Sequence, residues 1–359
     1  MEETAVADIQ LKEHKFPCKQ CGAELVFAPE VRDLKCPFCG YVENIPESPE
    51  AIKEYSFNDY LAQPRSKGYG KSAGREMRCE RCGAVALLDS SVRASSCAFC
   101  GSPMIQGDDK ASEDVISPEA IVPFVVTSEQ AQASFRKWIS SLWFAPGALK
   151  TENNLRQMQG VYRPFWTYDS HTVSHWTGER GDHYYVTERR GKETRSVRKT
   201  RWTSVSGTYR EFFDDVLIGA GKDTELKTSY KLAALTQYKP EFLSGFAAER
   251  YSVSCEHGWA RAKDVIKDLI YSAVRNRIGG DEQRVHSVDT AYSGITYKHV
   301  LLPLWLSCYR YKEKTYCFQV NGQTGEVAGA RPYSFWKIFL LVLAILAVIG
   351  IVALIVNAQ

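Results

Sequence analysis

The sequence predicts an α+β protein with two small cysteine-rich modules in tandem, an α+β domain and one C-terminal membrane-spanning helix. Three observations support this order. The motif C-x2-C-x14-C-x2-C occurs twice, helical and strand patterns alternate through the middle of the chain, and an unbroken apolar stretch follows them. The expected division is 16–44 and 77–106 for the modules, 45–76 and 107–120 for linkers, 121–333 for the domain and 338–356 for the helix.

Each cysteine module has the ligand spacing of a metal-binding ribbon. The two sets of candidate ligands are Cys18, Cys21, Cys36 and Cys39, and Cys79, Cys82, Cys97 and Cys100. When the modules are aligned at an offset of 61 residues, ten of 23 positions are identical, which indicates an internal duplication.

The residue types in these modules favour zinc. Two thiolates separated by two residues can hold one metal from a tight turn, and the glycine after each second cysteine allows the backbone to turn there. Four sulfurs at about 2.3 Å in a tetrahedron suit Zn²⁺, so we expect two structural zinc ions; rubredoxin-type iron is the alternative that "CPFCG" suggests. A ribbon of about 25 residues cannot bury a core, so the metal would supply much of its folding free energy.

The overall charge gives no argument for a nucleic-acid partner. The formal net charge is +3 in 359 residues, with cysteines counted as neutral. Four thiolates and one Zn²⁺ carry −2, so two such sites would lower the total to about −1. The ribbon surfaces mix basic and acidic residues, and both protein and nucleic acid remain open as partners, with protein favoured.

The distribution of apolar residues predicts a cytoplasmic protein with one membrane anchor. The N-terminal segment has no apolar stretch typical of a secretory signal. Paired C-x2-C turns, or knuckles, without such a signal indicate metal binding in a reducing compartment. Residues 338–356 are long enough to span about 28 Å. Arg331 and Lys337 precede them, so we expect a single-pass, tail-anchored protein with its N-terminal bulk in the cytoplasm.

The middle of the chain has the pattern of a cytosolic α+β domain. Thr127 and Gln130 form a capping pattern before a helix that carries Ala131, Phe135, Trp138, Ile139 and Leu142 on one side. A second helix over 257–278 carries Trp259, Ala262, Val265, Ile266, Leu269, Ile270 and Val274 on one side. Each helix precedes a V-x-x-P-x-W strand, "VYRPFW" and "VLLPLW", and "FQVNGQTGEVAG" predicts a closing hairpin. The repeated order suggests two related halves.

Three further features each allow a functional and a structural interpretation. Asp169, His171 and His175 would share a strand face, as a second metal site or, preferably, as exposed polar positions. The basic segment 187–201 could bind acidic phospholipids or a nucleic acid, or it could simply be a solvated hairpin, which is the preferred interpretation. Cys308 and Cys317 would face each other across a hairpin centred between Lys312 and Glu313, as packed thiols.

The chain resembles bacterial membrane-anchored proteins with TFIIB-type zinc ribbons and a C-terminal span. The matching stretches are both ribbons, "VPF" at 122–124, "RKWISSLWFAP" at 136–146, "GVYRPFWTYD" at 160–169, "TGERGDHYY" at 177–185, "LLPLW" at 301–305 and "VNGQTGEVAG" at 320–329. Members are often labelled primosomal, helicase-related or phage replication proteins, and some are similar to partners of phage-shock-type stress systems beside band-7 scaffolds. The resemblance implies the bacterial inner membrane and transfers only the ribbon cysteines.

Two functional hypotheses follow from these expectations. The first is a membrane-tethered adaptor whose ribbons recruit cytosolic or membrane proteins, including band-7 or phage-shock-type proteins, in an envelope-stress complex. The alternative is a nucleic-acid-binding protein of replication or transcription, which would leave the anchor without a role. We expect no enzymatic activity, because no combination of nucleophile, base and orienting group and no complete phosphate-binding loop can be identified.

Overall fold

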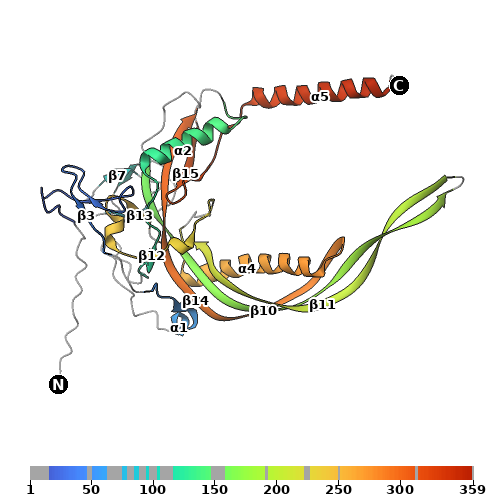
Figure 1. Ribbon diagram of the computed structural model, residues 1–359, viewed down its shortest axis with the longest axis horizontal. Helices are drawn as coiled ribbons and strands as arrows, with labels where there is room; N and C mark the ends of the chain where they lie inside the picture. The colour runs from blue at the N-terminus through green and yellow to red at the C-terminus, as the bar shows by residue number, and fades with distance from the viewer. Residues whose placement is uncertain are drawn as a thin grey trace.

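The computed structural model describes residues 16–46, 51–62, 75–78, 85–88, 94–96, 103–105, 116–146, 158–190, 193–221, 227–249, 251–311 and 314–357. A strongly curved sheet forms the centre of the molecule (Figure 1). A long two-stranded hairpin and an apolar helix project from the same side of the body (Figure 1). This mixed α/β arrangement agrees with the predicted fold class in its main outline.

Four strands in the order β11–β10–β14–β15 form the centre of the sheet. They are β10 (Gln159–Arg190), β11 (Glu193–Gly219), β14 (Glu282–Tyr311) and β15 (Lys314–Asn321). The two V-x-x-P-x-W motifs lie on β10 and β14 and pair with each other: Val161 is opposite Leu304, and Phe165 is opposite Val300. Because all four of these side chains are buried, the motifs mark the most buried part of the sheet.

Both predicted C-terminal hairpins are confirmed. Tyr311 pairs with Lys314, so the β14–β15 hairpin turns where the sequence indicated, and Cys308 lies directly opposite Cys317. The strand β16 (Val327–Gly329) then pairs with β15 and completes the closing hairpin. The two cysteines form a disulfide, so the expectation that they are separate packed thiols is wrong. Their direct cross-strand pairing brings the sulfurs within bonding distance.

The helix α4 (Cys255–Ile278) lies on the concave face of the sheet and contacts β10, β11 and β14 (Figure 1). Ser254 caps its N-terminus, and the helix begins two residues before the predicted start. Gly258 allows close approach, because a Cβ there would collide with the Tyr168 hydroxyl and the Trp166 ring. Its buried positions are Cys255, Gly258, Trp259, Ala262, Ile266, Ile270, Val274 and Ile278.

The buried side of α4 is narrower than the sequence predicted. Val265 is 43% exposed and Leu269 is 51% exposed, so the assignment of these two residues to the packed face is wrong. A single helix that packs on a sheet buries mainly one row of side chains, spaced three or four residues apart, that faces the sheet. Val265 and Leu269 lie beside that row and remain in contact with solvent.

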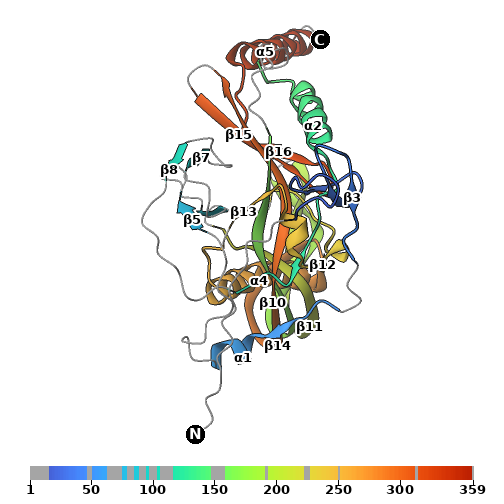
Figure 2. The ribbon, with the colours of Figure 1, turned by 90° about the vertical axis from the view of Figure 1, so that its left-hand side faces the viewer.

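The helix α2 (Ser128–Ser141) begins with the predicted capping box: the Thr127 side chain accepts from the Gln130 backbone N–H, and the Gln130 side chain accepts from that of Thr127. Ala131, Phe135 and Ile139 are buried. The Phe135 ring stacks on Phe318 of β15 with 3.8 Å between centroids. These contacts place α2 at the end of the sheet from which the C-terminal helix leaves (Figure 2).

The same order of elements occurs twice in the domain. The short strand β9 (Ala120–Ile121) precedes α2, β10 and β11, and β13 (Ala247–Glu249) precedes α4, β14 and β15. Each short strand pairs in parallel with the long strand of the other set, β9 with β14 and β13 with β10. Between the sets lie η1 (Leu232–Ala234), β12 (Thr236–Gln237) and η2 (Pro240–Leu243).

The segments expected to be linkers contribute to the body. β4 (Tyr55–Ser56) pairs with β14, and α1 (Phe57–Ala62) buries Phe57 against the aromatic cluster beneath α4. Ile116 is also buried. A buried lysine ties the first segment to the sheet: Lys298 Nζ lies 2.9 Å from Glu54 and 2.8 Å from Asp215. The partners of Phe57 and Glu54 lie far along the chain, so the composition of this segment alone does not reveal that it packs on the domain.

Candidate metal centre and membrane helix

The first cysteine module is a small three-stranded sheet with two tight turns. Its strands are β1 (Val26–Ala28), β2 (Asp33–Lys35) and β3 (Val42–Glu43). Pro17 pairs with Glu24 around the first knuckle, and Lys35 pairs with Val42 around the second. Gly22 and Gly40 follow the knuckles with φ of 75° and 77°, a backbone conformation that favours glycine. The turns thus aim both cysteine pairs at one point.

The four sulfurs of this module fit a tetrahedral metal site. Their Sγ atoms all lie within 4.8 Å of one another. The Sγ atoms of Cys18 and Cys39 are 3.5 Å apart, as are those of Cys21 and Cys36, and all four are free thiols. Sulfurs bound to zinc at about 2.3 Å in a tetrahedron are separated by about 3.8 Å. Only small adjustments therefore separate this arrangement from a zinc site with four cysteine ligands.

The thiols compete with one another for protons. The backbone N–H of Cys39 points at the Cys36 sulfur and lowers the pKa of that thiol to about 6. The Tyr41 N–H lowers the pKa of Cys39, but burial and the neighbouring sulfurs outweigh it and raise that pKa to about 12. A bound zinc would replace these protons and cross-link the two turns. Metal binding at this site is therefore expected to release protons.

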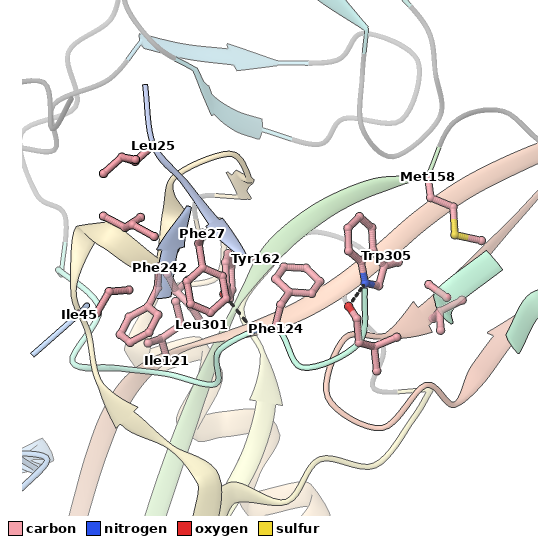
Figure 3. Packing of buried hydrophobic residues seen from close by; sticks show 14 of the residues in the cluster. Leu25, Phe27, Ile45, Ile121, Phe124, Met158, Tyr162, Phe242, Leu301 and Trp305 are labelled. Carbon is pink, nitrogen blue, oxygen red and sulfur yellow. Dashed lines mark hydrogen bonds between the residues drawn. The ribbon is translucent and has the colours of Figure 1, made fainter. Parts of the chain in front are cut away.

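The first module is packed into the domain. The Phe27 backbone N–H donates to the Ser244 carbonyl at 3.0 Å, and the Ser244 hydroxyl donates to the Leu25 carbonyl at 2.6 Å. The Phe27 ring contacts Phe242 edge-on with 5.4 Å between centroids. Leu25, Phe27 and Ile45 share one apolar cluster with domain residues such as Ile121 (Figure 3). One side of this module is thus covered by the domain.

The second set of predicted ligands, Cys79, Cys82, Cys97 and Cys100, lies outside the described residues. The flanking strands are described: β5 (Arg75–Arg78) pairs with β6 (Val85–Leu88), and β7 (Ala94–Ser96) pairs with β8 (Pro103–Ile105). The pairs nearest the cysteines are Arg78 with Val85 and Ser96 with Pro103. Both correspond to pairs in the first module, Pro17 with Glu24 and Lys35 with Val42, at the offset of 61.

Both modules contact one short segment of the domain. Val26 of β1 packs against Gly245, and Leu87 of β6 pairs with Ala248 of β13. Val26 and Leu87 are equivalent positions of the two modules. Figure 2 shows the first module and the strands of the second on opposite sides of the central strands β10 and β14. The segment Ser244–Glu249 is therefore a common attachment point that sequence reasoning missed, because its short apolar residues have no distinctive spacing.

The other predicted polar cluster is not a histidine site. Asp169 is buried, whereas His171 and His175 are exposed. Beside Asp169 each neighbouring strand, β11 and β14, carries one extra residue opposite β10. Asp169 accepts hydrogen bonds from Thr296 Oγ1 at 2.5 Å and the Asp215 N–H at 2.7 Å. Carboxylate oxygens of Asp169, Asp214 and Asp215 lie close enough to hold an ion, but the Lys298 ammonium already pairs with Asp215.

The fifth free cysteine described is not available as a nucleophile. Cys255 is 1% exposed under α4, and burial raises the pKa of its thiol to about 12. The Tyr168 hydroxyl donates to the Cys255 carbonyl at 2.6 Å, which fixes the start of the helix. A buried, protonated thiol of this kind acts as a small apolar side chain.

The C-terminal helix α5 (Phe335–Asn357) is long and apolar enough over Phe335–Val356 to cross a membrane, and none of its residues whose burial the structure describes is buried in the domain. It begins three residues before the predicted span. Lys337 Nζ donates to the carbonyls of Trp143 and Ala145 just after α2, at 3.0 and 2.8 Å. Trp143 and Trp336 are 75% and 69% exposed beside this contact. Exposed tryptophans at the start of a span are typical of a membrane–water interface.

Comparison with known proteins gives one match. No family model matches the sequence, and no solved structure matches it. An uncharacterized protein of Bacillus subtilis (strain 168), YdjG, is 26% identical over 332 residues, which cover 90% of this chain and 91% of that protein. The chain is therefore similar to a bacterial protein along most of both lengths.

Proposed function

We propose that this protein is a membrane-tethered adaptor whose zinc ribbons recruit cytosolic proteins to the inner membrane of a bacterium. One observation carries the proposal: a four-sulfur cluster is fixed to the same body from which an apolar, uncovered helix leaves. A protein held near a membrane meets its other membrane-bound partners at a raised effective concentration. The resemblance to phage-shock-type and band-7 systems suggests an envelope-stress complex as the setting.

We propose that each module holds one structural zinc ion. The sulfur distances support this for Cys18, Cys21, Cys36 and Cys39. For the second module, support comes from the identical ligand spacing and from strand pairs at equivalent positions. Native mass spectrometry of the full chain in detergent should show two zinc ions per chain. One zinc, or none in a folded chain, would contradict the assignment.

We propose that partners bind the knuckle end of the first module. Phe38 lies between Cys36 and Cys39 and is 82% exposed, and Val42, which pairs with Lys35 beside the second knuckle, is 42% exposed. The opposite side of the module packs on Phe242 and Ser244 and is not available. A partner with an apolar pocket would therefore meet Phe38 first, because exposed aromatic residues are frequent anchors of interfaces.

A photo-crosslinking amino acid at position 38 of the full chain in cells tests this surface. Leu269, 51% exposed on α4, is the control position. We expect position 38, and not position 269, to capture a cytosolic protein. The captured protein should leave the membrane fraction in cells carrying Phe38→Ala or lacking α5. If it stays in the membrane fraction in both variants, the adaptor function is wrong.

The alternative function is nucleic-acid binding, and the basic β10–β11 hairpin is the observation that favours it. Seven basic and two acidic residues lie in 187–201. A DNA probe titrated with the full chain in detergent micelles distinguishes the two functions. The adaptor proposal predicts no binding at low salt, whereas a shift that weakens steeply with salt would favour the alternative.

We further propose that the domain consists of two related halves. The order of one short strand, one helix and two paired strands occurs twice, with reciprocal parallel pairing of the short strands. Superposition of β9–α2–β10–β11 on β13–α4–β14–β15 in a crystal structure of the full chain would support the duplication. Different helix placement against the two long strands would contradict it.

A further inference from the structure

The outer part of the β10–β11 hairpin extends beyond the rest of the sheet. Pairing of β10 with β14 ends at Gly181 and Glu282, whereas pairing with β11 continues to Arg190 and Glu193. Residues 182–190 and 193–201 therefore form a two-stranded ribbon, which we call the arm (Figure 1). Such a ribbon buries little apolar surface and is at best marginally stable alone in water.

The strand register sorts the charges of the arm onto two different faces. Directly paired residues of a ladder share a face, and successive residues alternate. Tyr185 pairs with Arg198, and Arg189 pairs with Thr194, so these four side chains share one face with Thr187 and Ser196. We call this six-residue surface the basic face. Its two arginines are accompanied by hydroxyl groups, and His183 and Thr200, which continue this face toward the sheet, hydrogen-bond the Glu282 carboxylate.

The opposite face of the arm is largely neutralised. Lys199 pairs with Glu188 at 2.7 Å, and Arg201 lies over the Tyr184 ring at 5.3 Å. Arg195 lies beside the same Glu188 in the ladder. On the basic face the Glu282 carboxylate lies near Arg198, Arg189 forms no ion pair among the described residues, and Tyr185 is 70% exposed. Two exposed arginines, Arg189 and Arg198, beside an exposed tyrosine indicate an external anionic surface.

We propose that the basic face lies on the headgroups of anionic phospholipids in the membrane that α5 crosses. This inference rests on the proposed membrane anchoring. The arm and α5 project from the body toward the same side (Figure 1). A bilayer around α5 is therefore the large surface nearest to the arm. Basic residues are attracted to anionic headgroups, and tyrosine partitions to the membrane interface.

The charge of the arm determines how it meets the bilayer. Arg189, Arg195 and Arg198 are exposed and cannot enter the hydrocarbon without a large cost. The arm must therefore lie along the headgroups, with α5 tilted relative to the body. The domain would then contact the membrane at two places, the start of α5 and the arm, which would restrict its rotation about the helix.

Two adjacent tyrosines on opposite faces provide a matched test. The full chain carries benzoylphenylalanine in place of either Tyr185 or Tyr184 and is reconstituted in nanodiscs of phosphatidylcholine, with or without phosphatidylglycerol. Irradiation and mass spectrometry then count lipid adducts. We expect several-fold more adducts at 185 than at 184, only with phosphatidylglycerol, and fewer in high salt. Equal yields at both positions, or no dependence on phosphatidylglycerol, would overturn the inference.

Charge reversal distinguishes lipid binding from nucleic-acid binding at the arm. R189E/R198E should reduce adducts at 185 by roughly tenfold or more, since each arginine near an anionic surface changes the equilibrium about fivefold. R195E, on the opposite face, should change them little. Preferential crosslinking to added DNA, with lipid adducts abolished, would instead identify a nucleic-acid surface. If the chain fails to enter nanodiscs, the anchor itself is wrong; entry without adducts refutes only the arm contact.

Discussion

Truncating Phe27 should detach the first cysteine module from the domain without unfolding the module itself. Phe27 is 3% exposed and packs against Phe242, whereas Phe38 of the same module is 82% exposed. Loss of a buried phenylalanine side chain costs about 3–5 kcal/mol. The equivalent change at an exposed position usually costs less than about 0.5 kcal/mol. Phe38→Ala is therefore the natural control for Phe27→Ala.

Zinc should remain bound to the first module when the module no longer packs firmly on the domain. Structural zinc contributes about 10–16 kcal/mol in small ribbons, which exceeds the loss expected at Phe27. The backbone hydrogen bond from Phe27 to Ser244 and the Ser244 hydroxyl contact contribute about 1 kcal/mol each and are not removed by the substitution. We therefore expect Phe27→Ala to populate a state in which the module is folded, loaded with zinc and loosely attached.

Hydrogen exchange and native mass spectrometry of the full chain in detergent would measure both parts of this prediction. In Phe27→Ala, amides of 242–249 and of 24–28 should exchange at least tenfold faster, while the zinc count stays unchanged. In Phe38→Ala, neither should change. Equal exchange in the two variants would refute the packed arrangement. Loss of zinc in Phe27→Ala alone would show that the site depends on docking.

Three further changes test other parts of the structure. Cys36→Ser should remove one zinc per chain and expose the first module to protease, measured by native mass spectrometry and limited proteolysis; an unchanged zinc count would contradict its role as a ligand. Burial lowers the pKa of His299 to about 4. Below about pH 6.5 this histidine is protonated in the unfolded chain but stays neutral in the folded chain, so the free energy of unfolding should fall by roughly 3 kcal/mol as the pH drops to 4. Denaturant unfolding should show a smaller decrease in His299→Gln, and an identical decrease would exclude this histidine as the cause. Gly258→Ala should destabilise the domain by about 1–3 kcal/mol, because its methyl group would meet Tyr168 and Trp166, and thermal unfolding of this variant at the wild-type temperature would refute the close packing.

The sequence predicted features that depend on local chemistry. The knuckle spacing predicted the four-sulfur cluster, and the Thr127–Gln130 pattern predicted the capping box at α2. Strand alternation around Lys312 and Glu313 placed Cys308 opposite Cys317. In each case the partners lie within about 21 residues, and the geometry follows from short-range turns.

The features that were missed depend on long-range packing. Asp169 is buried by its contacts with Asp215 of β11 and Thr296 of β14, beside an extra residue in each of these strands, and a bulge has no distinct pattern in residue types. Phe57 occurs in a polar stretch, yet it packs against Trp259, 202 positions later, with 5.9 Å between ring centroids. Val265 and Leu269 were assigned to the buried side because both are apolar, although a single sheet covers only a narrow row of α4. Such outcomes are decided by which distant surfaces meet.

The shared attachment of both cysteine modules at Ser244–Glu249 has a geometric consequence for binding. Two modules on flexible linkers could bind one small target from any direction. Here β1 of the first module and β6 of the second contact the same short segment, Ser244–Glu249, from opposite sides of the central strands, so the spacing between β1 and β6 is set by the fold. If both modules recruit partners as proposed, they would hold two bound molecules at a set spacing, or bind one large assembly at two points.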